Sequence, residues 1–380
     1  MLRIAVDCRM ADSGGIGSFV RELIPHLLKE AECLLLGTHD QCEKYLRLDN
    51  VEFCFCEVKP FSFAEILAFP LSILDKINGC DAYFTPYCNI PRGITVPIFS
   101  TIHDLVFLDL KELASPIGRA ARKYFYKRAI SLSKEIFTVS RFSKSRIETL
   151  LKCKKPVNVV YNAAPSYLTE NDFGEVGAKI EKEEDTDTIL FVGNIKKHKG
   201  LKILLDAFMK ARAKGLKSTL TIVGNAENFR SGDEETVKRI ESINAAGAAN
   251  SSAQSKEPES AEQSARTKPV IFTGRISDAA LKELYKKSKV LVQPSLYEGF
   301  GIPPLEAMTV GTPALISDIP VFKEIYADFP VTFFKAGSSD DLAKKLSEDK
   351  FQKIKTSELP ALYSYKKSAE TIIKVIEKYK

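Results

Sequence analysis

The chain has 380 residues, which favours two domains of about 100–200 residues each over a single small fold. Hydrophobic residues make up 44% and charged residues 27% of the sequence, so a chain that is disordered from end to end is excluded. Lysine plus arginine (55) exceed aspartate plus glutamate (49) by 6, an excess too small to indicate a nucleic-acid partner.

The first residues, MLRIAVD, contain no long apolar region with a cleavage site, so we expect no signal peptide. The best apolar stretch, 66–74, is interrupted by Pro70 and is too short to cross a bilayer. All eight cysteines lie before residue 154 without zinc-ligand spacing, and we expect them to be reduced thiols of the core. These features indicate a cytoplasmic protein. If residues 115–134 contact lipid, as discussed below, the protein would also associate with the inner face of the membrane.

Short apolar runs alternate with longer amphipathic segments along the chain, which is the pattern of parallel strands covered by helices. The sequence therefore predicts an α/β fold with two mainly parallel sheets. The strands expected in the first sheet are 2–6, 33–36, 51–56, 82–85, 98–102, 136–139 and 157–161. Those expected in the second sheet are 189–192, 220–223, 270–273, 290–292 and 314–316.

A basic segment lies within the first half of the chain. Residues 115–134 hold six basic residues, no acidic residue and a run of three aromatic residues at 124–126. Such a helix suits peripheral contact with anionic lipid or with a polyanionic acceptor. It equally suits a packed helix whose long basic side chains form a cationic outer face. The sequence leaves both interpretations open.

An acidic, weakly apolar stretch near 165–187 divides the chain. We expect an N-terminal lobe over 1–165, a linker over 166–187, a C-terminal lobe over 188–360 and a final helix over 361–380. Residues 245–268 have almost no bulky apolar residue and are expected to be a mobile insertion. The apolar spacing predicts a helix that starts at Leu201 and closes before Gly215. A second apolar stripe, Ile372, Ile373 and Ile376, predicts a helix over 364–380.

The segment 290–313 contains the clearest candidates for ligand-binding residues. A buried strand ends at Gln293, a glycine-bearing loop follows, and Pro303 starts a helix. Glu298 on the loop and Glu306 in the first helical turn would face the crevice at the carboxyl end of the sheet. Carboxylates accept hydrogen bonds from vicinal diols such as those of sugars and ribose. The bland alternative is a loop glutamate in solvent and a glutamate stabilised by a helix N-terminus.

The loop between these acids could also cradle a phosphate. Glycine backbone approaches an oxyanion closely, and a helix N-terminus adds positive potential. The prolines have no N–H, so the donors would be the amides of Gly299, Phe300, Gly301 and Ile302.

With these residues in view, the segment resembles the E-x7-E motif of retaining glycosyltransferases of family 4, especially mannosyltransferase-like members. The resemblance extends over nearly the whole chain. Its pieces are GGIG at 14–17, TIHD at 101–104, VSRFS at 139–143, VYN at 160–162, FVGNIKKHKG at 191–200 and IFTG at 271–274. It implies a GT-B fold, in which two Rossmann-like lobes face each other across a cleft. The first lobe would bind the acceptor and the second a nucleotide-sugar, with the final helix crossing back to the first lobe.

The resemblance also assigns roles within the second lobe. Glu298 would hold hydroxyls of the donor hexose, Glu306 the ribose diol, and Lys199 would neutralise the leaving diphosphate. Many family members have an arginine where this chain has Asn194, so diphosphate binding would depend more on Lys199 or on Arg275. The alternative for Lys199 is a solvated lysine beside a helix.

In the first lobe, Gly15 and Gly17 lie between the first strand and a helix expected to begin near Ser18, where they could contact donor phosphates. They could also form an ordinary turn. The spacing is not the dinucleotide fingerprint G-x-G-x-x-G, which disfavours an NAD enzyme. By resemblance, His103 contacts the transferred sugar or the reacting centre, with Asp104 beside it. The alternative is a histidine bonded to backbone and an aspartate that caps the next segment.

The triplet 185–187 (Asp-Thr-Asp) resembles the metal-binding D-x-D of the other nucleotide-sugar transferase fold. Here it precedes a strand inside an acidic stretch, so we expect no metal site and no cofactor apart from the donor substrate.

Together with these observations, the resemblance implies a retaining, metal-independent hexosyltransferase of polysaccharide biosynthesis. It would move a mannose-like sugar from a nucleoside diphosphate to a hydroxyl of a glycan or lipid-linked acceptor. The alternatives are a sugar-nucleotide epimerase of the same fold and a noncatalytic glycan-binding subunit.

Overall fold

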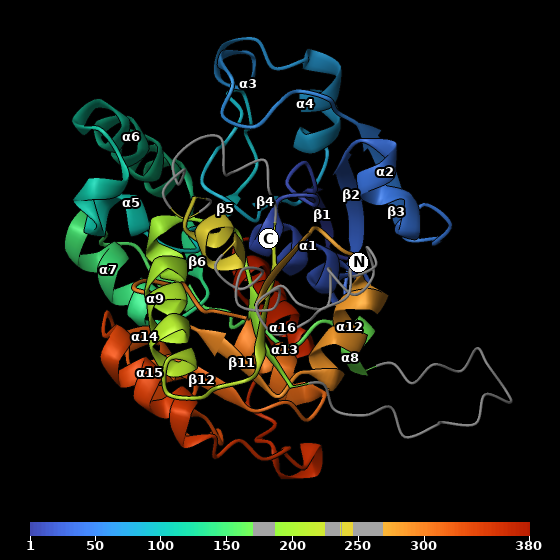
Figure 1. The fold of residues 1–380 in the computed structure, drawn as a ribbon. Helices are drawn as coiled ribbons and strands as arrows, with labels where there is room; N and C mark the ends of the chain where they lie inside the picture. Colours follow the sequence, from blue (N-terminus) through green and yellow to red (C-terminus); the bar gives the residue numbers. More distant parts are fainter. Residues whose placement is uncertain (170–186, 225–235, 237, 246–268) are drawn as a thin grey trace, which may run out of the picture. The chain divides into compact units, whose positions relative to one another are not determined.

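The computed structural model describes residues 1–169, 187–224, 236, 238–245 and 269–380. These residues form two compact units: Met1–Pro165 with Ala361–Lys380, here the N-terminal unit, and Ser166–Pro360, the C-terminal unit. Each unit is built on one parallel sheet with helices packed against it (Figure 1). This confirms the predicted α/β class. Most of the expected linker and all but the first residue of the expected insertion 245–268 lie outside the described residues.

The sheet of the N-terminal unit has seven parallel strands in the order β3-β2-β1-β4-β5-β6-β7. Their bounds are β1 Arg3–Asp7, β2 Glu32–Gly37, β3 Val51–Phe55, β4 Ala82–Thr85, β5 Ile98–Thr101, β6 Glu135–Thr138 and β7 Val157–Val159. The order reverses between β1 and β4, because β2 and β3 extend to one side of β1 and the later strands to the other. Ligands of open α/β sheets bind beside the carboxyl ends of strands at such a reversal.

Helices cover both faces of this sheet. Their bounds are α1 Gly14–Leu27, α2 His39–Cys42, α3 Phe63–Leu67, α4 Leu71–Asn78, α5 Val106–Asp109, α6 Pro116–Leu132, α7 Arg141–Leu151 and α16 Tyr365–Glu377. Successive side chains of a strand point to opposite faces. Accordingly, Ile4 and Val6 of β1 pack in the core cluster that holds α1 and α16, whereas Ala5 packs in the cluster that holds α4 and α7.

Helix α16 belongs to the N-terminal unit although it ends the sequence. Its predicted stripe of Ile372, Ile373 and Ile376 is buried in the same core cluster as Phe19 of α1. The Ser368 hydroxyl also donates a hydrogen bond to the carbonyl of Tyr161 at 2.7 Å.

The sheet of the C-terminal unit has six parallel strands in the order β10-β9-β8-β11-β12-β13. Their bounds are β8 Thr188–Val192, β9 Thr219–Val223, β10 Val270–Gly274, β11 Val290–Gln293, β12 Ala314–Ser317 and β13 Thr332–Phe334. The helices around it include α8 Ser166–Thr169, α9 Leu201–Arg212, α12 Asp278–Lys287, α13 Pro303–Thr309, α14 Pro320–Ile325 and α15 Ser339–Glu348. Here the strand order reverses between β8 and β11.

The predicted strands are all present, with ends that differ by at most two residues. Strand β13 was not predicted, because its three residues at the sheet edge form too short an apolar run. Helix α9 buries its predicted apolar face and ends at Arg212, followed by Gly215 at φ 102°.

The eight cysteines are free thiols and seven are buried, as predicted. Burial raises the pKa of Cys33 and of Cys88 to about 12.

Among the described helices, none combines the length and the apolar composition that a membrane crossing requires.

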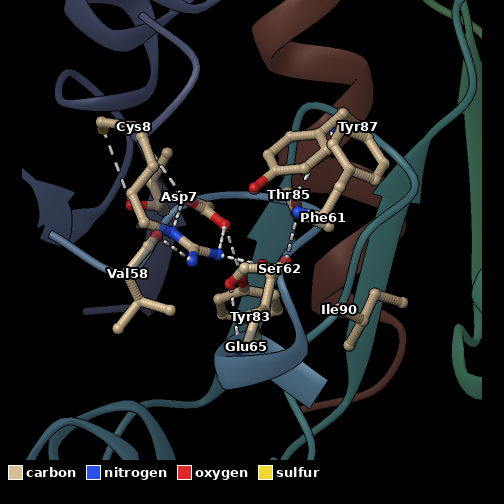
Figure 2. Close-up of polar contacts among 12 residues, drawn as sticks. Asp7, Cys8, Val58, Phe61, Ser62, Glu65, Tyr83, Thr85, Tyr87 and Ile90 are labelled. Carbon is tan, nitrogen blue, oxygen red and sulfur yellow. Dashed lines mark hydrogen bonds and ion pairs between the residues drawn. The ribbon is translucent and has the colours of Figure 1, made fainter. Parts of the chain in front are cut away.

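A buried ion cluster lies at the carboxyl ends of β1 and β4 (Figure 2). Arg9 donates to both oxygens of Asp7, at 2.9 and 2.6 Å, and to Glu65 at 2.6 Å. The Tyr83 hydroxyl donates to Asp7 at 2.8 Å, and the Phe61 amide donates to Glu65 at 2.8 Å. The cluster thereby ties the segment that contains α3 to the end of β1.

The cluster makes stability depend on pH. Burial raises the pKa of Glu65 to about 6, against the opposing effect of Arg9 and with the support of the nearby Asp7 carboxylate. Because the folded state holds this proton more tightly, the contribution of Glu65 to the free energy of unfolding is full below pH 4.5 and is lost as the pH rises through about 6. The loss amounts to about 2 kcal/mol.

We therefore expect Glu65→Gln to remove this pH dependence. Urea denaturation between pH 4 and pH 7 should show the wild type losing about 2 kcal/mol relative to the variant. Glu57→Gln, which changes an exposed neighbour, is the matched control and should follow the wild type. If the unfolding free energies of the wild type and Glu65→Gln changed equally with pH, the role given to Glu65 would be contradicted.

Candidate functional site

The reversal of strand order in the C-terminal unit brings two loops together. One follows β8 and contains the 3-10 helix Lys197–Lys199, and the other follows β11 and contains Glu298. Strands β8 and β11 are parallel neighbours, so both loops leave the same edge of the sheet. The site is therefore built at the position where open parallel sheets bind ligands.

Gly200 permits the close approach of these loops. It adopts φ 72°, and a Cβ atom there would lie 2.0 Å from the carbonyl oxygen of Pro294. A residue with a side chain would face both the left-handed backbone and that clash. The amide of Leu296 donates to the carbonyl of His198 at 2.7 Å and fixes the two loops to each other.

Lys199 and Glu298 form a partly buried ion pair at this point. The Lys199 ammonium lies 2.8 Å from each carboxylate oxygen of Glu298. Ser295 donates to the same carboxylate at 2.7 Å, and Gln293 donates to Ser295 at 3.0 Å. The side chain of Glu298 is 8% exposed and that of Lys199 is 21% exposed, so the ammonium keeps access to solvent. A residue pair separated by almost a hundred positions is thus held in one geometry.

The electrostatics of the pair follow from its partners. Burial alone would raise the pKa of Glu298, but the charge and hydrogen bonds of Lys199 and the hydrogen bond of Ser295 lower it overall. His198, next to Lys199 in the chain, has its pKa lowered to about 4 by burial and by the Lys199 charge. At neutral pH the site therefore holds an ionised carboxylate, an ammonium group and a neutral imidazole.

Glu306, the second predicted acid, lies in the first turn of α13, which begins at Pro303 as expected. Its carboxylate accepts a hydrogen bond of 2.6 Å from the hydroxyl of Tyr285 on α12. Tyr285 is fully buried, and burial together with the Glu306 charge raises its pKa well above the ordinary value. The tyrosine therefore remains a donor and holds the carboxylate in place.

The four residues of the predicted phosphate cradle, Gly299, Phe300, Gly301 and Ile302, are all buried. Gly301 adopts φ 84°, and a Cβ there would lie 2.3 Å from a ring carbon of Phe322. The Tyr326 hydroxyl donates to the carbonyl of Gly301. This turn is packed tightly against α14 and Tyr326, and its role in phosphate binding stays a prediction.

Asn194 and Arg275 lie in the loops after β8 and β10. The amide of Gly224 donates to the carbonyl of Gly274 at 3.1 Å, and Gly193 donates to Val223 at 2.9 Å, so these loops lie along one edge. Arg275 is exposed and Asn194 is half-buried. Both residues therefore lie at the carboxyl ends of the strands, as Lys199 does.

The candidates of the N-terminal unit form a separate group. The His103 ring donates from Nε2 to the carbonyl of Pro86 at 2.7 Å, since a carbonyl only accepts. Burial lowers its pKa to about 4, and its ring contacts that of Phe19 edge-on at 5.2 Å between centroids. Asp104 accepts from the amide of Val106 at 3.0 Å, the local capping contact that the sequence left open.

Gly15 and Gly17 are part of α1 itself, which begins at Gly14 and not near Ser18 as expected. Gly14 adopts φ 49°, which starts the helix earlier than its first bulky residue suggests. A Cβ on Gly17 would lie 2.2 Å from the carbonyl oxygen of Ala11, whereas one on Gly15 would contact nothing within 4 Å. Gly17 is therefore required for packing, and Gly15 leaves open space.

Three residues of the C-terminal site were not predicted: Ser295, His198 and Tyr285. Ser295 precedes Glu298 by three residues in the same loop, and His198 adjoins Lys199, so both had a local signal. Tyr285 lies on another helix, and its contact with Glu306 becomes visible only in three dimensions.

Within the described residues, no group of three or more histidine, cysteine, aspartate or glutamate side chains is placed to hold a metal ion. Asp187 of the D-x-D triplet accepts from Ser218 and pairs with Lys289, while positions 185 and 186 lie outside the described part of the chain.

Comparison with protein families connects this geometry to a known class. Residues 172–350, which include Lys199, Glu298 and Glu306, match the family described as glycosyl transferases group 1. This region of the chain belongs to the group 1 glycosyltransferases. The resemblance drawn from the E-x7-E spacing is thereby confirmed at the level of the family.

Two mannosyltransferases are among the relatives of this chain. It is 28% identical over 259 residues to the O-antigen chain mannosyltransferase RfbU of Salmonella typhimurium, a match that covers 67% of this chain and 61% of RfbU. It is 42% identical over 81 residues to the serotype-specific mannosyltransferase WbdA of Escherichia coli, covering 21% of this chain and 10% of WbdA. The matches thus span less than two thirds of either relative.

Solved structures of similar fold cover the whole chain. Sucrose-phosphate synthase from Thermosynechococcus elongatus aligns with a TM-score of 0.65 at 17% identity, over 100% of this chain and 99% of that structure. Anabaena HepE, solved in complex with UDP and glucose, aligns with a TM-score of 0.66 at 15% identity, over 100% of both chains. At these identities the similarity shows the fold, and the expected GT-B class is confirmed.

The ion pair predicts a measurable stability effect. Lys199→Ala leaves the buried Glu298 carboxylate without its cation, which should cost about 1.5–3 kcal/mol of unfolding free energy at pH 7. The pKa of Glu298 is lowered in the fold, so the stabilisation is present above its ordinary pKa and is lost as the pH falls through the lowered value. The cost of Lys199→Ala should therefore shrink in acid.

Urea denaturation followed by circular dichroism measures this effect. Lys199→Arg keeps the charge and should retain most of the stability, and Lys214→Ala removes an exposed lysine as a control. An unchanged unfolding free energy in Lys199→Ala at pH 7 would show that the ion pair contributes nothing.

Proposed function

We propose that the protein is a retaining, metal-independent hexosyltransferase that uses a nucleoside diphosphate sugar as donor. The acceptor would be a hydroxyl of a glycan or of a lipid-linked saccharide in polysaccharide biosynthesis. The observation that carries the proposal is the Lys199–Glu298 pair at the carboxyl ends of β8 and β11, with Glu306 following in α13. It joins a fixed cation to two acids in a group 1 glycosyltransferase.

Lys199 is proposed to stabilise the leaving diphosphate. Its ammonium is one fifth exposed and held by Glu298, so it is oriented before any donor arrives. A preorganised cation stabilises developing negative charge without paying for reorganisation during the reaction. Arg275 and the backbone at 299–302 are proposed as further contacts of the diphosphate and hexose.

Glu298 and Glu306 are proposed to recognise hydroxyl groups. A carboxylate has about four acceptor positions, so Glu306 retains capacity for the ribose diol while it accepts from Tyr285. Glu298 is ionised by its partners and would accept hydrogen bonds from hydroxyls of the donor hexose. In this scheme Glu298 both orients Lys199 and contacts the sugar.

His103 of the N-terminal unit is proposed to contact the transferred sugar. Its lowered pKa keeps the ring neutral at pH 7, and its Nε2 proton is used by Pro86, so Nδ1 is the acceptor nitrogen. A neutral Nδ1 is better suited to accept a hydrogen bond from a sugar hydroxyl than to transfer a proton. The proton of the acceptor substrate's hydroxyl would instead pass to the leaving phosphate oxygen in a front-face displacement.

The donor is the first point to test. RfbU and WbdA are mannosyltransferases, which supports a mannose donor, whereas HepE was solved with UDP and glucose. A thermal-shift panel of nucleoside diphosphates and their sugars should reveal the base and sugar, because a ligand at 100 times its dissociation constant adds about 2.7 kcal/mol. Glu306→Gln should weaken the affinity for the nucleotide that responds, while Glu283→Gln, which changes a half-exposed carboxylate of α12 paired with Lys286, should not. If no nucleotide responds, the donor class is wrong.

Turnover tests the chemistry. With the donor so identified, Lys199→Ala should lower turnover about 10²–10³-fold, comparable to the loss of one oxyanion donor, and Lys214→Ala should not.

Activity should persist in EDTA, and product NMR should show the anomeric configuration of the donor. Product that forms without acceptor would indicate an epimerase. Unchanged turnover and donor affinity in Lys199→Ala, or loss in EDTA with rescue by Mn²⁺, would contradict the proposal.

A further inference from the structure

Exposed apolar side chains gather on a few neighbouring elements of the N-terminal unit. Phe61, Phe63 and Leu67 lie on or beside α3, Leu71 opens α4, and Ile117 and Tyr124 lie on α6. Phe63 and Ile117 are 84% and 83% exposed, and Leu71 is 76% exposed. Single exposed apolar residues need no explanation, but a contiguous group marks an interaction surface.

The segment 60–74 presents no charge to solvent. Its sequence, PFSFAEILAFPLSIL, has one ionisable residue, Glu65, and that side chain is buried on Arg9 (Figure 2). The ion cluster thus removes the one charge of the segment and at the same time fixes the backbone through the Phe61 amide. Phe63, Leu67 and Leu71 are held outward on a fixed element.

Helix α6 supplies a basic neighbour to this segment. Ala129 is the one buried residue described for its 17 positions. Ile117, Ala121 and Tyr124 follow at helical spacing and are all exposed, so they share an apolar stripe. Lys123 and Lys127 are exposed beside it, and residues 115–134 contain no acid. Ala129, Tyr126 and Ile130 pack one face of α6 against the core, so the helix is packed and also carries a cationic outer face.

The two elements meet through aromatic contacts. The Phe61 ring lies 6.1 Å from the Phe125 ring of α6, centroid to centroid, and Phe125 lies 5.6 Å from Tyr124. The uncharged segment and the basic helix are therefore in contact, and their exposed residues together are here called the α3–α6 surface.

We propose that the α3–α6 surface docks the protein on an anionic lipid bilayer. Phe63, Leu67 and Leu71 would enter the boundary between headgroups and acyl chains, with Ile117 and Tyr124 beside them. Lys123 and Lys127 would lie at the headgroups, where each basic residue near an anionic surface contributes about 1 kcal/mol. The inference adds a partner to the proposed transferase and needs no donor or acceptor to be tested.

Charge decides between a bilayer and another occupant. Two copies of this surface would bring their lysine-rich flanks together, which opposes self-association. An apolar face flanked by lysines, with no exposed acid within 60–74 or 115–134, is the pattern of interfacial membrane segments. The best apolar stretch of the chain, 66–74, is also too short and too interrupted to cross a bilayer, but it is long enough to lie in an interface.

Vesicle sedimentation with the full chain tests the proposal. Vesicles of phosphatidylcholine with phosphatidylglycerol should pellet the protein, pure phosphatidylcholine should not, and binding should fall steeply with salt. Lys123→Gln with Lys127→Gln should weaken partitioning about 30-fold, the effect of two basic residues. Phe63→Ser with Leu67→Ser should weaken it at least about tenfold.

Matched controls change equivalent residues elsewhere. Leu48→Ser with Leu362→Ser removes exposed leucines, and Lys214→Gln with Lys217→Gln removes exposed lysines, and both should bind vesicles like the wild type. Circular dichroism and thermal denaturation without ligand confirm that each variant folds.

Three results would overturn the proposal. The first is no binding to anionic vesicles. The second is binding that the α3–α6 variants and the controls weaken equally. The third is a dimer in size-exclusion chromatography that Phe63→Ser with Leu67→Ser dissolves while vesicle binding is absent, which would assign the surface to a second copy. None of these depends on sugar transfer, so the proposed function is tested separately.

Discussion

The ion pair of Lys199 and Glu298 joins the two loops that form the candidate site of the C-terminal unit. Three constraints produce it: β8 and β11 are neighbours, Gly200 has no side chain to hold the loops apart, and Ser295 fixes the carboxylate. Burial alone would raise the pKa of Glu298, and the Lys199 ammonium together with the Ser295 hydrogen bond lowers it instead. A group placed in this way costs little to reorganise when a charged ligand arrives. The proposed donor chemistry rests on that preorganisation.

The two units use the same sheet position differently. In the C-terminal unit the reversal of strand order carries the Lys199–Glu298 pair, which remains partly open to solvent. In the N-terminal unit the corresponding position, beside β1 and β4, is filled by the buried cluster of Arg9, Asp7 and Glu65 (Figure 2). There the charges satisfy one another and anchor a surface segment. This contrast supports donor binding in the C-terminal unit and a positioning role for the N-terminal cluster.

Local patterns made most of the fold predictable. Apolar runs located every strand except β13, the 3.6-residue period located α9 and α16, and the spacing of Glu298 and Glu306 indicated the family from the amino-acid sequence alone. Contacts between distant segments were not predictable, because periodicity carries no information about which loops meet. The Tyr285–Glu306 bond and the Arg9–Glu65 pair are of this kind. The start of α1 was misplaced because Gly14 begins the helix in a conformation that residues with side chains avoid.

A double-mutant cycle on nucleoside diphosphate affinity tests the central claim most directly. Dissociation constants are measured by calorimetry for the wild type, Lys199→Ala, Glu298→Gln and the double variant. If Glu298 orients Lys199 for the diphosphate, the two substitutions should be coupled by at least about 1 kcal/mol. Effects that add to within about 0.3–0.5 kcal/mol, or affinities that neither substitution changes, would contradict the account.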